Sequence, residues 1–252
     1  STTVRFRSHI AGASTWIDAI TSRVHRVTLN GIDVDPATVS DGYRISLENL
    51  ALDNELIVEA DAAYTNTGEG LHRFVDPVDD ETYLYTQFEV PDSRRMFAVF
   101  EQPDLKATFQ FTVTAPSYWQ VVSNQPTPAP ADNGDGSSTW TFEPTPRISS
   151  YITALVAGPY VAKRSELTSS DGRTIPLGVF CRASLAEYLD EDYIFEKTRQ
   201  GFTFFESRFG VAYPFDKYDQ LFVPEFNAGA MENAGCVTFV EAYVFRSKVT
   251  DA

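Results

Sequence analysis

The 252-residue sequence is poor in the residues that build metal and redox sites. Its three histidines are scattered, and its two cysteines, Cys181 and Cys236, lie far apart with none of the spacings that metal binding uses. Isolated thiols of this kind are more typical of reduced core residues than of a disulfide, which indicates a cytoplasmic protein. The sequence also lacks a Gly-rich phosphate loop, so it carries no common nucleotide-binding motif.

Positive charge and long apolar runs are scarce as well. Lys and Arg number 20 against 35 Asp and Glu, which gives a formal net charge of -15. Nucleic acids and anionic membranes are bound by basic patches, and no apolar run approaches membrane-spanning length. We therefore expect no nucleic-acid partner and no membrane partner. The acidic balance is explained first by solubility, and attraction of cationic peptides is the second interpretation.

Apolar residues are present in the proportion that a packed core requires, since 43% of the sequence is hydrophobic and 13% is aromatic. Short β-branched and aromatic segments occupy the first two-thirds of the chain, and turn signals such as Asn30-Gly31 separate them. Their alternation predicts antiparallel sheets in a mainly β fold of the sandwich or saddle type. The predicted strands are Thr3–Phe6, Val24–Leu29, Arg44–Leu47, Glu55–Ala60, Tyr83–Glu89, Ala107–Thr114, Trp119–Ser123, Thr139–Phe142, Tyr151–Ala157 and Ile175–Cys181.

A polar segment rich in Pro and Gly, residues 126–138, has the composition of a linker. The segments on either side of it, 121–123 and 139–141, have strand character and could pair with each other. We therefore predict one long hairpin loop here rather than a boundary between domains.

The sequence pattern changes after residue 183. Apolar residues recur at helical spacing from Ile194 to Phe209, and Gly210 stands where such a helix would end. Two further strands are predicted, at Gln220–Pro224 and Cys236–Val240. We therefore expect a β-rich domain over residues 1–185, followed by the incomplete start of an α/β domain over residues 186–252. A helix and two strands without their partners would leave apolar surface exposed.

The strongest candidate site is the segment that ends in Glu232. Gly229 and Ala230 are small enough for another backbone to approach closely, and the Glu232 carboxylate can pair with the α-ammonium of a peptide. A charge-assisted hydrogen bond of this type contributes roughly 1.5–3 kcal/mol when it is shielded from water. The simpler interpretation is a solvated glutamate at a strand end, and the small residues beside it favour the site.

A weaker candidate is the predicted strand that contains Gln87 and Glu89. The two residues are two positions apart, so both side chains would project from one face of the strand and could form a second clamp on an ammonium group. Alternating polar residues are common on exposed sheet faces, so this pair alone has little weight. The neighbouring Arg94 and Arg95 are expected to pair with local carboxylates.

Together these segments resemble a known family. The run Gly229-Ala230-Met231-Glu232-Asn233 is similar to the exopeptidase signature of the zinc aminopeptidases related to aminopeptidase N, and the actinobacterial members are the most similar. The segments Tyr213–Gln220, Phe222–Ala228 and Thr86–Glu89 agree with this resemblance, which extends along essentially the whole chain.

The resemblance implies a β-rich N-terminal domain and the beginning of a thermolysin-like catalytic domain. It implies that Glu232 and Glu89 hold the free amine of a peptide, that Gln87 lines the same pocket and that Gly229 and Ala230 bind the peptide backbone. Ala228 would help to shape the pocket for the first side chain. The implied substrate-binding set is Gln87, Glu89, Ala228, Gly229, Ala230, Met231, Glu232 and Asn233.

The resemblance also implies Zn²⁺, bound by a His-Glu-x-x-His motif and a further Glu that this sequence does not contain. We expect zinc in a longer parent protein, no cofactor, metal ligand or catalytic residue in this chain, and no activity of this chain alone. The alternative is a non-catalytic relative that serves as an interaction scaffold. A third hypothesis is a peptidase that also opens a lipid epoxide. Glu89 disfavours it, because such relatives have Gln at the matching position.

Overall fold

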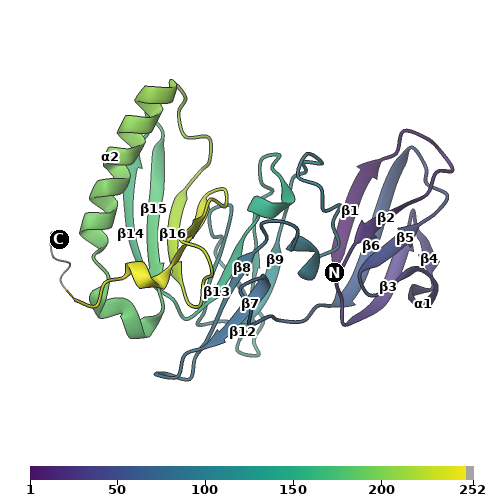
Figure 1. The fold of residues 1–252 in the computed structure, drawn as a ribbon, viewed down its shortest axis with the longest axis horizontal. Coiled ribbons are helices and arrows are strands. Elements are labelled where there is room, and N and C mark those ends of the chain that lie inside the picture. Colours follow the sequence, from purple (N-terminus) through teal and green to yellow (C-terminus); the bar gives the residue numbers. More distant parts are fainter. Residues whose placement is uncertain (248–252) are drawn as a thin grey trace. The chain divides into compact units, whose positions relative to one another are not determined.

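The computed structural model describes residues 1–247, which form two compact units whose residues alternate along the chain. The first unit comprises Ser1–His72, Gln87–Ala107 and Ile148–Tyr151, and the second comprises Arg73–Thr86, Thr108–Arg147 and the remainder of the chain from Ile152. Strands dominate both units and most pairs of strands are antiparallel, which confirms the predicted mainly β fold (Figure 1).

The first unit is a small β-sandwich. Its larger sheet has the order β1-β6-β3-β4 and its smaller sheet pairs β2 with β5. Alternating apolar side chains of both sheets form one core cluster, in which Ile17, Ile45 and Leu56 are fully buried. The elements are β1 (Thr2–Arg7), β2 (Thr15–Asp18), β3 (Arg23–Leu29), β4 (Ile32–Val34), α1 (Pro36–Val39), β5 (Arg44–Leu47) and β6 (Asp53–Asp61).

Two further sheets are formed by strands from the middle of the chain. One has the order β10-β13-β8-β7 and the other has the order β11-β12-β9. Their strands are β7 (Gly70–Val75), β8 (Thr82–Gln87), β9 (Thr112–Pro116), β10 (Gln120–Ser123), β11 (Ala131–Asp132), β12 (Ser137–Thr141) and β13 (Leu155–Gly158), with short helical turns η1 (Ser93–Arg95) and η2 (Ser150–Ile152).

The predicted pairing across residues 126–138 is wrong. Val121–Ser123 pair with β13, and Thr139–Thr141 pair with β9, so the two segments enter different sheets. The loop instead contains its own small hairpin, in which Asp132 pairs with Ser138 and Asn133 N donates to Ser137 O. The turn at Asn133–Gly136 can be predicted from neighbouring residues, because Asn and Gly favour turns. The strand with which each segment pairs depends on residues that are distant in the sequence.

Two predicted strands are shorter than expected. Residues 107–111 lie outside β9, although Ala107 forms a single bridge with Ile148. Residues 150–152 form a helical turn, so β13 begins only at Leu155. Ala154, which lay within the second of these predicted strands, is buried without being part of a strand.

The last part of the second unit is a mixed sheet with one helix against it (Figure 1). Its order is β14-β15-β16-β18-β17, where β16 is parallel to both β15 and β18 and the two outer pairs are antiparallel. The helix α2 connects the parallel strands β15 and β16, as a crossover between parallel strands requires. The elements are β14 (Val161–Thr168), β15 (Thr174–Cys181), η3 (Ala183–Tyr188), α2 (Glu191–Phe209), β16 (Tyr218–Val223), β17 (Ala230–Met231), β18 (Cys236–Val240) and η4 (Glu241–Tyr243).

The helix α2 begins and ends where the sequence predicts. Asp190 caps it by accepting a hydrogen bond from Tyr193 N, and Gly210 ends it in the left-handed conformation with φ of 67°. Its apolar stripe packs on the sheet through Phe195, Ile194 and Phe202. No helix among residues 1–247 has both the length and the apolar character needed to cross a membrane.

Buried charge lies within the mixed sheet, and Gly178 makes room for it. Asp219 is almost fully buried and pairs with Arg164 at 3.1 Å and with Lys217 at 2.7 Å. A Cβ atom on Gly178 would lie 2.2 Å from Asp219 Oδ1. The glycine is required here by this close approach.

We predict that Gly178→Ala lowers the free energy of unfolding by about 3 kcal/mol or more, because the methyl group would displace a buried ion pair. The matched control is Gly201→Ala in α2, where an added Cβ meets nothing within 4 Å. This control should raise stability by about 0.5–1 kcal/mol, since alanine favours the helix. Urea unfolding of both variants measures the difference, and equal effects would contradict the packing argument.

Candidate functional site

The predicted signature segment forms the edge of the mixed sheet. In β17, Ala230 lies opposite Phe239 and Met231 lies opposite Thr238, while Val240 N donates to Gly229 O at 3.1 Å. Hydrogen bonds alternate along an antiparallel pair, so the N–H and C=O of Ala230 point away from β18. Within residues 1–247 no further strand pairs on that side. The edge can therefore accept an added peptide strand.

Gly229 lies in close contact with another part of the same chain. A Cβ atom here would lie 2.8 Å from the hydroxyl oxygen of Tyr243, whose ring is half-exposed. A small residue is therefore required at Gly229 by an aromatic side chain of the same chain. Gly229 and Ala230 are both exposed.

Glu232 follows the edge strand directly and is exposed. Its neighbours Met231 and Asn233 are buried, at 1% and 2% exposure. The Asn233 amide donates to Thr238 Oγ1 at 3.4 Å, and Asn233 O accepts from Cys236 N at 3.0 Å. Met231 and Asn233 thus hold the strand end in place while Glu232 points outward. Direct contact of either neighbour with a ligand stays a prediction.

The expected strand containing Gln87 and Glu89 is too long. β8 ends at Gln87, and Glu89 is an exposed residue in a turn closed by a hydrogen bond from Asp92 N to Phe88 O at 3.1 Å. Pro91 has no N–H with which to continue a ladder, so the strand stops before it. The argument that strand alternation places both side chains on one face therefore fails for Glu89.

The amide oxygen of Gln87 could accept a hydrogen bond from a ligand. Its amide oxygen is buried and accepts no hydrogen bond from any residue in the described part of the chain. Buried polar atoms are rarely left without a partner, so such an atom marks a place where a donor can bind. Gln87 and Glu89 belong to the first compact unit, whereas Ala228–Asn233 belong to the second. Their action on one ligand stays a prediction.

Tyr85 holds the segment that leads into the edge strand, and the sequence analysis missed it. The side chain is fully buried, and its hydroxyl donates to Glu225 O at 3.2 Å. Its ring also meets that of Phe226 edge-on, with centroids 5.7 Å apart. Burial raises the pKa of Tyr85, so the hydroxyl remains a donor at neutral pH. Only the alternation of large residues in β8 could have indicated this role.

A buried arginine holds the segment that follows β18. Arg182 donates to both carboxylate oxygens of Glu241, from Nε at 2.6 Å and from Nη2 at 3.1 Å, and to Asp76 Oδ2 at 2.5 Å. Glu241 is the first residue of η4, whose last residue is Tyr243. The position of Tyr243 beside Gly229 therefore depends on this bidentate pair.

The carboxylate of Asp76 is fully buried within this network. Burial by itself would raise the pKa of Asp76, but hydrogen bonds from Ser184 and Val78 N, together with the Arg182 guanidinium, outweigh it and lower that pKa. Asp76 is therefore ionised in the folded protein at neutral pH.

The thiols and the arginine pair behave as the sequence predicts. Cys181 and Cys236 are buried and unpaired, and burial raises the pKa of each thiol to about 12, which makes them poor nucleophiles and metal ligands. Arg95 Nε lies 2.6 Å from Asp92 Oδ1, and Arg94 Nη1 lies 4.0 Å from a carboxylate oxygen of Asp18. Both arginines therefore have acidic partners, which for Arg95 is nearby in the sequence and for Arg94 is nearby only in the fold.

Residues 1–247 contain no group of three or more His, Cys, Asp or Glu side chains that could hold a metal ion.

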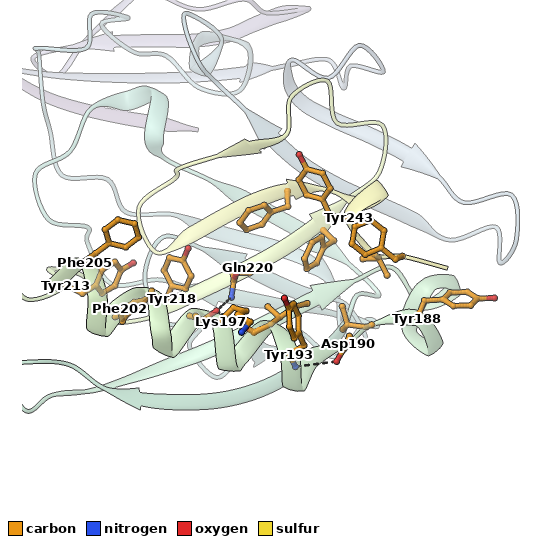
Figure 2. Close-up of a pocket in the computed structure, with 18 of the residues that line it drawn as sticks. Tyr188, Asp190, Tyr193, Lys197, Phe202, Phe205, Tyr213, Tyr218, Gln220 and Tyr243 are labelled. Atoms are coloured by element: carbon orange, nitrogen blue, oxygen red, sulfur yellow. Dashed lines mark hydrogen bonds between the residues drawn. The ribbon is translucent and has the colours of Figure 1, made fainter. Parts of the chain in front are cut away.

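A groove with a volume of about 1370 Å³ lies against α2 in the second unit (Figure 2). Aromatic side chains from the helix line it on one side, and Tyr213, Tyr218 and Tyr243 line it from the sheet and the segments beside it. Phe205 and Phe209 of the helix are more than half exposed, which confirms the predicted exposed apolar surface. Tyr243 thus lines this groove and also contacts the edge strand.

Comparison with known proteins identifies relatives for both parts of the chain. A family profile described as the Peptidase M1 N-terminal domain matches residues 14–152, and the Peptidase family M1 domain matches residues 193–251. The predicted domain boundary after residue 185 stays a prediction.

Three relatives are aminopeptidases by name. Aminopeptidase N of Streptomyces lividans is 64% identical over 252 residues, which is 100% of this chain and 29% of that protein. Aminopeptidase N of Acetobacter pasteurianus is 37% identical over 63% of this chain and 43% of that protein, and aminopeptidase Ey of Gallus gallus is 36% identical over 62% of this chain and 16% of that protein. The chain therefore spans less than half the length of these relatives.

We predict that Arg182→Met lowers the free energy of unfolding by about 3–5 kcal/mol, because Asp76 would remain buried without its cationic partner. The matched control is Arg5→Met, which removes an ion pair with Glu55 that is exposed on both sides and should change stability little. Urea unfolding of the two variants makes the comparison. A similar small effect of both substitutions would show that the buried network does not hold η4.

The pH dependence of stability should reflect Asp76. Its folded pKa is lowered, so the unfolded state binds more protons and the stability contributed by Asp76 is lost as pH falls through the folded value. We expect the free energy of unfolding to decline below about pH 4, near the ordinary pKa of aspartate. Asp76→Asn should be less stable at neutral pH and should flatten this acid decline. Parallel pH profiles of the two proteins would rule out Asp76 as a cause.

Proposed function

The chain belongs to peptidase family M1, and from this premise we propose that it is the N-terminal part of a zinc-dependent aminopeptidase that releases N-terminal residues from peptides. The proposed part of this chain is to anchor the free amine of the substrate. One observation carries the proposal: an exposed carboxylate, Glu232, directly follows an edge strand whose Ala230 main chain points outward.

In the proposed complex the peptide lies along β17 as an added strand. The N–H and C=O of Ala230 hydrogen-bond its main chain, and each such bond contributes about 0.5–1.5 kcal/mol net. Glu232 pairs with the α-ammonium and adds about 1.5–3 kcal/mol where water is excluded. Main-chain bonds are the same at every position of a peptide, so the ionic contact alone sets the register and selects the first residue.

The second proposed part of the anchor is formed by Gln87 and Glu89. An ammonium group has three N–H donors and can therefore serve two carboxylates and one amide oxygen at once. The buried, unpartnered Gln87 Oε1 and the exposed Glu89 carboxylate support this role. Ala228, which is exposed at the start of the edge segment, would border the pocket for the first side chain and leave it roomy.

The proposed zinc ligands lie outside residues 1–247, in which no three ligating side chains come together. The contribution of this chain is therefore the binding and orientation of the peptide, and we expect the 252-residue chain alone to have no peptidase activity. The rest of the proposal is a peptide partner with a free N-terminus, no nucleic-acid or membrane partner, and a cytoplasmic location. The net charge of -15 and the two unpaired thiols support it.

We predict that Glu232→Gln, in the full-length enzyme that carries this chain, lowers kcat/KM on peptides with a free amine by about 10- to 100-fold, the equivalent of one charge-assisted hydrogen bond. Glu166→Gln on β14 is the control, because Glu166 is exposed and lies on the opposite edge of the same sheet. Steady-state kinetics on matched free and N-acetylated peptides measures the effect. Unchanged kcat/KM in Glu232→Gln, or equal turnover of acetylated peptides by the wild type, would refute the anchor.

A further inference from the structure

A turn follows Glu232 directly in the sequence. Residues 233–236 form this turn, closed by the hydrogen bond from Cys236 N to Asn233 O at 3.0 Å. Gly235 adopts the left-handed conformation with φ of 67°. All four residues are buried, although the turn lies between an edge strand and an exposed glutamate. Whatever holds this turn also determines where Glu232 lies.

Asn124 holds the first half of the turn. Its side chain is buried, with 3% exposure, and its amide donates to Ala234 O at 2.8 Å and to Ile152 O at 2.9 Å. Its Oδ1 accepts from Ala154 N at 2.9 Å, so three hydrogen bonds fix the amide. The main-chain oxygen of Asn124 also lies only 2.6 Å from where a Cβ of Gly235 would be.

Lys217 holds the second half of the turn. Its ammonium group donates to Gly235 O at 2.6 Å and lies 2.7 Å from Asp219 Oδ2. The side chain is 4% exposed, so this charge is shielded from water. The two successive carbonyls of the turn, Ala234 O and Gly235 O, therefore each accept from a buried side chain of a different segment. Ala234 N completes the anchoring by donating to Ile152 O at 3.2 Å.

We propose that Asn124 and Lys217 are positioning residues that hold Glu232 in the geometry needed to pair with the substrate amine. This inference rests on the proposed function. Neither residue touches the substrate in this arrangement, since both are buried behind the turn. Loss of Asn124 leaves the buried carbonyl of Ala234 without its side-chain donor, and loss of Lys217 leaves Gly235 O with only the hydrogen bond from Asp219 N at 3.2 Å, so the turn is held less firmly in either case. A displacement of about 1 Å at a binding group can lower a rate by about 100-fold.

The test is a double-mutant cycle in the full-length enzyme, with Asn124→Ala, Glu232→Gln and the combination of both. Asn124→Ala should lower kcat/KM on a free-amine peptide by at least about tenfold. In the Glu232→Gln background the same change should cost less than about twofold, because the charged group that it positions is already gone. Equal effects of Asn124→Ala in the two backgrounds would overturn the positioning role.

The matched control is Asn54→Ala in the first unit. Asn54 is 5% exposed and makes three comparable hydrogen bonds, with Ala51 N, Ala51 O and Asn30 Nδ2. Its loss should lower the midpoint of urea unfolding to a similar extent and leave kcat/KM within about twofold of the wild type. If Asn54→Ala lowers kcat/KM as much as Asn124→Ala, general destabilisation explains both and the inference fails.

Lys217 provides the test if Asn124→Ala does not fold. Lys217→Met removes the donor to Gly235 O, whereas Lys217→Arg keeps a cation that can reach both Gly235 O and Asp219. Lys217→Met should lower kcat/KM and Lys217→Arg should restore most of it, while wild-type kinetics of Lys217→Met would contradict the inference. Failure of the anchor itself is distinguishable, because it would appear as unchanged kcat/KM in the single variant Glu232→Gln.

Discussion

The mixed sheet of the second unit ends in a strand that pairs on one side only and must still be held in place. β17 has only two residues, and by alternation its bonds to β18 engage Gly229 and Met231 while Ala230 faces outward. So short a pairing is weak by itself. Hydrogen bonds to the segments on either side of the strand in the sequence therefore determine where it lies. Tyr85 donates to Glu225 O, which precedes β17, and Asn124 donates to Ala234 O, which follows it. The contact of Asn124 with Ala234 O is buried, which keeps water from competing for that carbonyl group, and the contact of Tyr85 with Glu225 O is partly buried.

The buried charges around this strand fix the geometry of the structure more than they add to its net stability. A buried ion pair often contributes no more stability than a well-packed apolar pair, yet removal of one partner is costly. Asp76 of the Arg182 network accepts a further hydrogen bond from Ser184, and in the Lys217–Asp219 pair Lys217 also donates to Gly235 O while Asp219 Oδ1 accepts from Arg164. Alternative positions of the η4 segment would separate Glu241 from Arg182 and are therefore disfavoured.

The sequence predicted what depends on neighbouring residues. The start and end of α2 follow from Asp190 and Gly210, and four of the strands in the first sandwich follow from alternation within a few residues. The errors occurred where the outcome depends on distant partners. Residues 121–123 and 139–141 both form strands, but nothing local in them encodes that they join different sheets. The error at Glu89 has a local source instead: the alternation continues past Gln87, where β8 ends, although Pro91 shortly after it already disfavours a long strand.

The sequence by itself determined the mainly β class, the start and end of α2 and the presence of the signature segment, because short-range periodicity and the residues themselves encode these directly. Only the tertiary structure decided that Gly229 lies against Tyr243, that Arg182 pairs with Asp76 and Glu241, and that Asn124 and Lys217 hold the turn after Glu232. These contacts join residues that are far apart in the sequence, and each depends on burial that exists only once the sheets have packed.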